Sequence, residues 1–226
     1  MAQARTALEV RRWGSGTACI VRLLIAAGTP LTQSAIAAMT LVSQPRASQV
    51  VAMLTDLEAV RSVRTGYIGK RARLLDLYAH RTRPVLTEPE RHFYGTRSQR
   101  EQATRILRTA RRHGVRIAFS TDLAADLLVP WRHPTLTAVY AQVSFPIEDA
   151  GLVVAEGRAD ASIILRITSD QTLLAASDPW PSVMDGMPLT DPVQQWWDLL
   201  DLGGEDRAEA AARLRRAILN RSIASS

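Results

Sequence analysis

A group of polar side chains able to bond base edges or phosphates stands at the start of one helical segment. The group comprises Gln44, Arg46, Ser48 and Gln49. Amide, guanidinium and hydroxyl groups match the donor and acceptor geometry of base edges and phosphate oxygens. The apolar residues that follow, Val50, Leu54 and Leu57, recur at helical spacing. This pattern predicts a helix that buries one side and offers the other to a nucleic acid.

A second group is basic and surrounds a predicted hairpin. Its members are Arg64, Lys70, Arg71 and Arg73. Two β-favouring runs, 60–65 and 73–78, flank the segment 66–72, in which Gly66 and Gly69 permit a tight reversal. We therefore expect Lys70 and Arg71 at the tip of the hairpin, and Arg64 and Arg73 on its arms.

Residues suited to other chemistries form no recognisable constellation. The sequence lacks GxGxxG, GxxxxGK, GxSxG and HExxH motifs. Its single cysteine, Cys19, excludes an intramolecular disulfide and a cysteine metal cluster, and its four histidines lack metal-ligand spacing. Asp122 and Asp126 lie one helical turn apart, as do Asp198 and Asp201, but no partner base or metal is indicated, which favours solvated faces. We expect no catalytic residues, no metal, no cofactor and no enzymatic activity.

Three predicted helices, 17–27, 33–39 and 46–57, must position the first polar group. Thr32 and Ser43 are placed to cap the second and third helices, and Pro45 is tolerated in a first turn. With the basic hairpin, these helices predict a winged helix-turn-helix domain over residues 15–84, after an N-terminal arm at 1–14. The third helix would enter the major groove of double-stranded DNA, with the hairpin on the backbone or in the minor groove. A merely solvated hairpin or a protein-binding winged helix remains an alternative.

The charge of the chain is divided between its halves. Up to Arg116 there are 20 Lys or Arg against 7 Asp or Glu, whereas from Ile117 onward there are 8 against 15. A basic half suits a polyanionic partner, and an acidic half suits a different task. Residues 85–114, at the junction, begin Pro-rich and continue highly charged, so they predict a linker and a connecting helix. That helix is either solvated or adds phosphate contacts.

Residues 115–226 alternate short strands with short helices. Strands are predicted over 115–119, 136–140, 161–167 and 172–176, and helices over 122–128, 145–151, 191–200 and 205–219. Thr121 would cap the first of these helices. Trp196 and Trp197 are adjacent, so we expect one to be buried and the other to be partly exposed at a partner surface. The predicted fold class is α+β, with an N-terminal winged helix-turn-helix and a C-terminal mixed α/β domain ending in two helices.

The C-terminal half resembles the AbiEi-type antitoxins of bacterial abortive-infection (type IV) toxin–antitoxin systems. The family carries a PVQxYxDLL pattern followed by a glycine pair near its C-terminus. The matching residues are Pro192, Val193, Gln194, Asp198, Leu199, Leu200, Gly203 and Gly204. Trp196 replaces the usual aromatic residue. The segment 119–131 also resembles the strand and small helix with which the family's domain opens.

The resemblance implies a DNA-binding antitoxin that represses its own operon through inverted repeats and neutralises a nucleotidyltransferase-fold toxin encoded beside it. Trp196 and Trp197 would then lie near the toxin-binding surface. The N-terminus lacks the apolar run of a signal peptide and no stretch approaches membrane-spanning length, which together with one cysteine favours the cytoplasm. An alternative is a stand-alone winged-helix regulator whose C-terminal domain senses a ligand or partner. A nuclease or transferase with a DNA-binding arm is a third, against which the missing motifs count.

Overall fold

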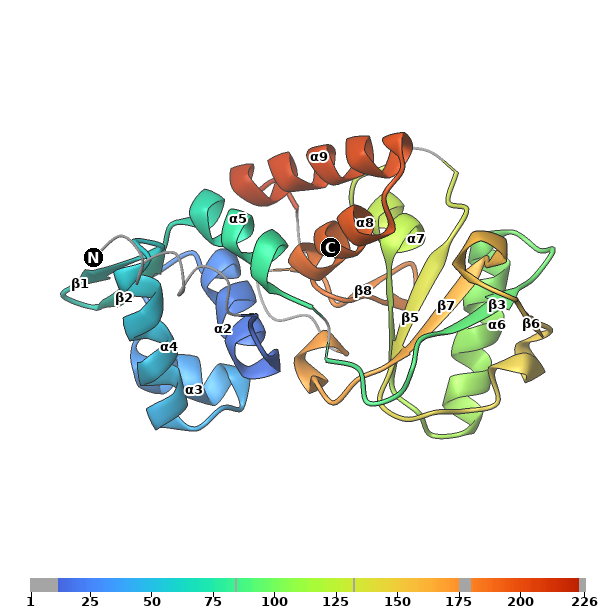
Figure 1. Cartoon of the computed structure of the whole chain (residues 1–226), viewed down its shortest axis with the longest axis horizontal. Helices are drawn as coiled ribbons and strands as arrows, with labels where there is room; N and C mark the ends of the chain where they lie inside the picture. Colours follow the sequence, from blue (N-terminus) through green and yellow to red (C-terminus); the bar gives the residue numbers. More distant parts are fainter. Residues whose placement is uncertain (1–11, 84, 132, 175–179, 224–226) are drawn as a thin grey trace. The chain divides into compact units, whose positions relative to one another are not determined.

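A computed structural model describes residues 12–83, 85–131, 133–174 and 180–223. The chain divides into two compact units, Met1–Val85 and Leu86–Ser226 (Figure 1). Helices and strands are mixed in the α+β manner that the sequence predicts. No helix among the described residues is long and apolar enough to cross a membrane.

The first unit places two predicted helices around a buried one and continues into a hairpin. Its described elements are α2 (Ser15–Ala26), α3 (Gln33–Thr40), α4 (Gln44–Asp56), β1 (Val60–Val63), β2 (Gly66–Gly69) and α5 (Arg71–Arg81). α2 forms the centre, because its residues from Thr17 to Ala26 are buried. The predicted cap of α3 is confirmed: Thr32 Oγ1 accepts the N–H of Ala35 at 3.2 Å. Ser43 occupies the N-cap position of α4, but its side chain makes no capping bond.

The hairpin is shorter than predicted, and its second arm was placed wrongly. β1 and β2 pair antiparallel, from Val60 opposite Gly69 to Val63 opposite Gly66, around a two-residue turn. The predicted strand over 73–78 lies instead in α5. Residues 74, 75, 77, 78 and 81 are buried at helical spacing, so the burial pattern of this leucine-rich run has the helical period. The sequence fragment 73–78 was too short to distinguish the two periods.

Both glycines of the hairpin stand where backbone approaches backbone. A Cβ atom on Gly66, which has φ +139°, would lie 2.5 Å from the carbonyl oxygen of Leu31. A Cβ atom on Gly69 would lie 2.6 Å from the carbonyl oxygen of Leu24. Tyr67 exchanges two backbone hydrogen bonds with Leu31, of 2.9 and 3.0 Å. The glycines therefore let the hairpin dock against the end of α2 and the connection to α3.

The second unit is built on a five-stranded sheet of order β4-β5-β7-β3-β6 (Figure 1). β5 and β7 pair parallel, and the other neighbours pair antiparallel. The strands are β3 (Arg91–Tyr94), β4 (Ile117–Ser120), β5 (Thr137–Ala141), β6 (Val153–Val154) and β7 (Ile163–Ile167). The helices are α6 (Gln99–Arg112), α7 (Thr121–Leu128), α8 (Pro192–Leu202) and α9 (Glu205–Asn220). A small hairpin joins β8 (Val183–Met184) to β9 (Met187–Pro188).

Short 3₁₀ helices complete this unit. They are η1 (Ile147–Ala150), η2 (Arg158–Asp160) and η3 (Gln171–Leu173). η1 lies in the short helix predicted over 145–151. η3 replaces the first part of the strand predicted over 172–176, whose residues 175 and 176 lie outside the described residues.

From Leu86 onward, the segment predicted as a linker and connecting helix belongs to the second unit, and its helix is α6. β3 lies inside the sheet, between β7 and β6, and α6 buries Ala103, Ile106 and Ala110 in the main core. The difference in net charge is smaller between the two structural units than between the two halves of the sequence divided at Arg116. Residues 1–85 hold 12 Lys or Arg and 4 Asp or Glu, whereas residues 86–226 hold 16 and 18. The first unit is thus basic, while the second is nearly neutral and carries its own basic segment.

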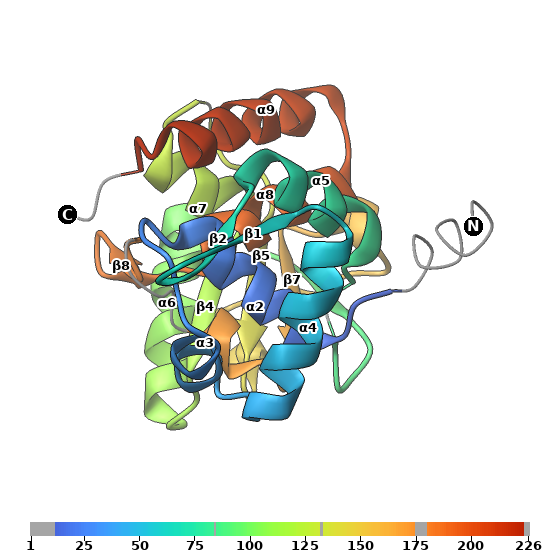
Figure 2. The ribbon, with the colours of Figure 1, turned by 90° about the vertical axis from the view of Figure 1, so that its left-hand side faces the viewer.

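The two faces of the sheet differ in chemistry. Alternate strand residues such as Phe119, Val139 and Leu165 join α6 in an apolar core. Their neighbours Tyr140 and Arg166 point to the opposite face and bond to Asp198 of α8. This follows from the two-residue period of a strand. α6 and α8 accordingly lie on opposite sides of the sheet (Figures 1 and 2).

Candidate functional site

The first two turns of α4 carry an exposed polar surface, as predicted. Gln44, Arg46 and Gln49 are exposed and Ser48 is partly so. The opposite side of α4 packs into the first unit through Ala47, Val50, Val51 and Leu54. The helix bears one acidic residue, Asp56, at the end remote from the polar group. The structure therefore gathers all four predicted residues on one end of one helix.

Arg46 is exposed but also anchored. Its Nη2 donates to Thr17 Oγ1 of α2 at 2.9 Å. A guanidinium has five N–H donors, so this bond leaves others available. The contact with α2 restricts the direction in which Arg46 can reach.

Only one of the four predicted hairpin cations lies on the hairpin. Arg64 occupies the two-residue turn and is exposed. Exposed residues beside it that the sequence prediction missed are Arg61, Ser62 and Thr65. The hairpin formed by β1 and β2, with Arg61 and Arg64, is therefore the basic projection next to α4 in the chain.

Lys70, Arg71 and Arg73 were assigned to the hairpin wrongly, because α5 begins where its second arm was expected. Lys70 occupies the N-cap position of α5 and Arg73 is exposed on its first turn. Arg71 Nε donates to the carbonyl oxygen of Ile25 at 2.7 Å, and its Nη2 donates to that of Ala27 at 3.2 Å. These carbonyls end α2, so Arg71 caps the C-terminus of that helix.

Both tryptophans proposed as partner anchors are buried. Trp196 is 4% exposed and Trp197 is 3% exposed. The expectation that one would be exposed is wrong, because α8 packs against α7, α9 and β4 together and buries every residue from Pro192 to Leu199. A helix surrounded on several sides has no free face for the second of two adjacent residues.

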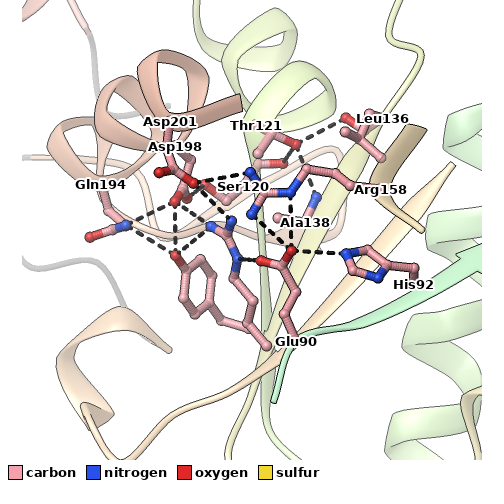
Figure 3. Close-up of polar contacts among 12 residues, drawn as sticks. Glu90, His92, Ser120, Thr121, Leu136, Ala138, Arg158, Gln194, Asp198 and Asp201 are labelled. Carbon is pink, nitrogen blue, oxygen red and sulfur yellow. Dashed lines mark hydrogen bonds and ion pairs between the residues drawn. The ribbon is translucent and has the colours of Figure 1, made fainter. Parts of the chain in front are cut away.

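A charged centre that the sequence did not predict lies between the sheet and α8 (Figure 3). The expectation that Asp198 lies on a solvated face is wrong, because this centre buries it completely. Arg166 of β7 is 2% exposed. Its Nη1 donates to Asp198 Oδ1 at 2.6 Å and to the Tyr140 hydroxyl at 3.1 Å. Its Nε donates to Glu90 Oε2 at 2.7 Å. A guanidinium buried this deeply requires such pairing, since an isolated charge would be too costly.

Asp198 collects donors from three secondary-structure elements besides β7. It accepts a bond from Ser120 Oγ of β4, one of 2.8 Å from the Tyr140 hydroxyl, and one of 3.0 Å from Gln194 Nε2. Burial raises the pKa of Asp198 above its ordinary value, against the opposing influence of Arg166 and these donors. Burial likewise raises the pKa of the Tyr140 hydroxyl.

Glu90, just before β3, closes the outer end of the centre. Arg158 Nη2 and His92 Nε2 each lie 2.9 Å from Glu90 Oε1. Burial alone would raise the pKa of Glu90, but Arg166, Arg158 and His92 together hold that pKa at about 2. Glu90 is therefore a carboxylate at neutral pH, shared by two arginines.

The turn into α7 beside this centre is strained. Thr121 has φ +65° although its side chain is β-branched and fully buried. Its hydroxyl donates to the carbonyl oxygen of Leu136 at 2.9 Å and accepts the N–H of Ala138 at 2.9 Å (Figure 3). Thr121 thus ties this turn to β5, and the prediction that it caps α7 is wrong: the N-cap position belongs to Ser120. The expectation that Asp122 is solvated is also wrong, because its carboxylate is buried and pairs with Arg207 at 2.8 Å.

This centre is arranged to hold the unit together. Ser120, Tyr140 and Asp198 are completely buried, and both hydroxyls donate to Asp198, so none of the three offers an accessible reactive atom. Among the described residues, no group of three or more His, Cys, Asp or Glu is placed to hold a metal ion. The sequence did contain a signal for it: Arg166 interrupts an apolar strand, and Asp198 interrupts an apolar helix.

A scan against protein-family models and searches of curated proteins and of solved structures find no match to this chain. The motif residues Gln194 and Asp198, on which the family resemblance partly depends, both belong to the buried centre. Their role in this chain is structural.

Proposed function

We propose that the first unit is a winged helix-turn-helix domain that binds double-stranded DNA, and that the protein is a transcriptional repressor. The observation that carries this proposal is the exposed polar end of α4, followed along the chain by a projecting hairpin with Arg61 and Arg64. The excess of basic residues in residues 1–85 favours a polyanionic partner over a neutral one.

In this proposal α4 enters the major groove with its N-terminal end. Gln49 can form a paired hydrogen bond with adenine, and Arg46 can do so with guanine. Gln44 and Ser48 are placed at the positive end of the helix dipole, near phosphate. Arg61 and Arg64 on the hairpin would bind the backbone or the minor groove. Arg64 therefore keeps the DNA contact that the sequence predicts for it. Arg61 takes the place of Lys70, Arg71 and Arg73 in this contact.

The resemblance to AbiEi-type antitoxins supports a narrower proposal: the protein represses its own operon and neutralises a nucleotidyltransferase-fold toxin in the cytoplasm. The second unit would bind the toxin, although Trp196 and Trp197 are too buried to anchor it directly. A stand-alone regulator, with the second unit sensing a ligand or partner, is the alternative. A toxin gene beside this one, and rescue of its toxicity by co-expression, would decide for the antitoxin.

The DNA-binding proposal is tested with the full chain and labelled duplexes. Fluorescence anisotropy would compare the region upstream of the gene with a random duplex of equal length, at several salt concentrations. We expect tighter binding to the upstream region and a steep loss of affinity with salt, because counterions are released from neutralised phosphates.

The hairpin provides the matched variants. Arg61→Gln with Arg64→Gln should weaken binding to both duplexes alike and lower the salt slope by about two, one for each phosphate contact. Arg73→Gln removes an exposed charge from the same unit and should leave the slope unchanged. Binding that ignores salt, or a hairpin pair that behaves like Arg73→Gln, would contradict the proposal.

A further inference from the structure

The exposed side of α6 is strongly basic, although it belongs to the nearly neutral second unit. Arginines recur there from the residue before its N-cap to the start of β4. They are Arg97, Arg100, Arg105, Arg108, Arg111, Arg112 and Arg116. The one acidic residue within the helix, Glu101, completes a capping box with Ser98. Glu101 thus serves the start of the helix, and its one ion pair among the described residues is with Arg97, at 4.0 Å.

The arginines of this side differ in their partners. Arg100 pairs with Asp185 at 2.9 Å, and Arg105 reaches the carbonyl oxygen of Ala150 at 3.4 Å. Arg112 donates to Thr109 Oγ1 at 3.1 Å. Arg108 and Arg111 are exposed, and neither side chain has a hydrogen bond or ion pair among the described residues. The two free guanidiniums lie one helical turn apart.

An open hollow of about 460 Å³ runs along these two arginines. It is lined by Thr104, Leu107, Arg108, Arg111 and Arg112. Like charges three and four residues apart repel each other on a helix. The helix dipole compensates at Arg111 and Arg112 in the last turn, but its influence does not extend to Arg108. Arg108 is therefore offset neither by the helix dipole nor by an ion pair among the described residues, which leaves it available to an anionic partner.

We propose that the face of α6 formed by Arg108, Arg111 and Arg112 binds the phosphate backbone of duplex DNA, as a contact separate from α4 and the hairpin. This proposal rests on the DNA-binding function proposed above. Arginine is suited to the task, because its planar fork pairs with phosphate oxygens. The face presents few groups other than guanidinium, so it would bind DNA without regard to sequence.

The test uses the full chain carrying Arg108→Gln and Arg111→Gln, with a fluorescein-labelled random duplex and the upstream duplex as probes. Affinity for both should fall by the same factor, and the salt slope should fall by about two. Arg215→Gln with Arg216→Gln in α9 removes the same charge from the same unit and should leave the slope intact. Arg108→Lys with Arg111→Lys should restore most of the slope, which excludes misfolding as the cause.

Three results would overturn the proposal for α6. An unchanged slope in the glutamine pair overturns the proposal and favours an acidic protein as the partner of this face. Equal losses in the α6 and α9 pairs overturn it in favour of a net-charge effect. Stronger binding to an RNA duplex of the same sequence overturns the assignment to DNA. The proposed function fails separately, through the Arg61 and Arg64 variants, whose slope change does not depend on α6.

Discussion

Helices α4 and α8 contain similar residues in opposite surroundings: the glutamine side chains are exposed on α4 and buried on α8. Both begin with a proline in the first turn, and both carry two glutamines. Gln44 and Gln49 of α4 are exposed, whereas Gln194 and Gln195 of α8 are 1% and 0% exposed. In α8 the amide nitrogens donate within the fold: Gln195 Nε2 donates to the carbonyl oxygen of Thr190 at 2.7 Å, and Gln194 Nε2 donates to Asp198 Oδ1 at 3.0 Å. The same side chain is thus exposed in one helix and bonded inside the fold in the other.

The comparison separates two kinds of mutational effect. Substitutions around α8 should lower the free energy of unfolding and leave the DNA affinity of the folded protein unchanged. Substitutions on the exposed side of α4 should do the reverse. A variant that moves both quantities would break the distinction.

The largest effect is expected at the buried centre. Arg166→Met leaves Asp198 without its cationic partner, at a cost of about 3–5 kcal/mol in the free energy of unfolding. Urea denaturation followed by circular dichroism measures this cost. The second substitution Asp198→Leu, added to Arg166→Met, should recover a part of it, because the uncompensated buried charge is then gone.

Asp201→Asn is the matched control for that experiment. Asp201 lies 3.5 Å from Arg166, but its side chain is 25% exposed, so its loss should cost well under half as much. Equal costs for the two variants would mean that burial does not govern the strength of these pairs.

The second-largest effect that we expect is a dependence of the free energy of unfolding on pH, caused by Glu90. Glu90 has a pKa of about 2 in the folded protein against an ordinary value of 4.5. The depressed pKa contributes stability that is complete above pH 4.5 and is lost as the pH falls toward 2. With partial screening by solvent, the contribution is about 2–3 kcal/mol.

Wild type and Glu90→Gln should therefore differ most in unfolding free energy at neutral pH and converge in acid. Asp198, whose pKa is raised, contributes to the pH dependence of stability in the opposite direction. Because Asp198 is present in both proteins, its contribution cancels in the difference between wild type and variant. A difference that stays constant from neutral pH to acid would show that Glu90 is not held as a carboxylate by its arginines.

Capping residues and helix-ending glycines in the sequence predicted helices α3 and α8 correctly. Thr32 marks the start of α3, and the Asp191 side chain accepts the N–H groups of Val193 and Gln194 as a cap. The glycines at 203 and 204 end α8 as expected. Capping and periodicity depend on neighbours within one or two turns, so they are visible in one sequence.

The predictions that were wrong or missing concern features that depend on contacts between residues far apart in the sequence. β3 has a charged sequence and becomes a strand because β7 and β6 pair with it. Arg166 finds Glu90 across 76 residues of chain, and Arg71 finds Ile25 across 46. Neither the buried centre nor the capping role of Arg71 can be derived from spacing alone. The polar end of α4, which is local, was located correctly.

A smaller effect tests the exposed side of the comparison. Gln49→Ala should reduce discrimination between upstream and random duplexes by about 1–3 kcal/mol, the worth of a paired base contact. Competition titrations measure it. Gln142→Ala removes an exposed glutamine from the second unit and should change neither binding nor discrimination. If Gln49→Ala weakens both duplexes equally, Gln49 binds phosphate instead of a base.

The smallest effect distinguishes an arginine that caps a helix from one that we propose to bind DNA, both within the first unit. Arg71→Ala removes two hydrogen bonds to the end of α2, and should lower the free energy of unfolding by about 1 kcal/mol. Arg64→Ala, at the exposed turn, should leave stability unchanged and weaken binding to all duplexes. Thermal denaturation and salt titration of the two variants measure both quantities. If instead Arg71→Ala lowers the salt slope and Arg64→Ala does not, α5 would carry the backbone contact and the hairpin would not, because the contact follows the cation that reaches phosphate.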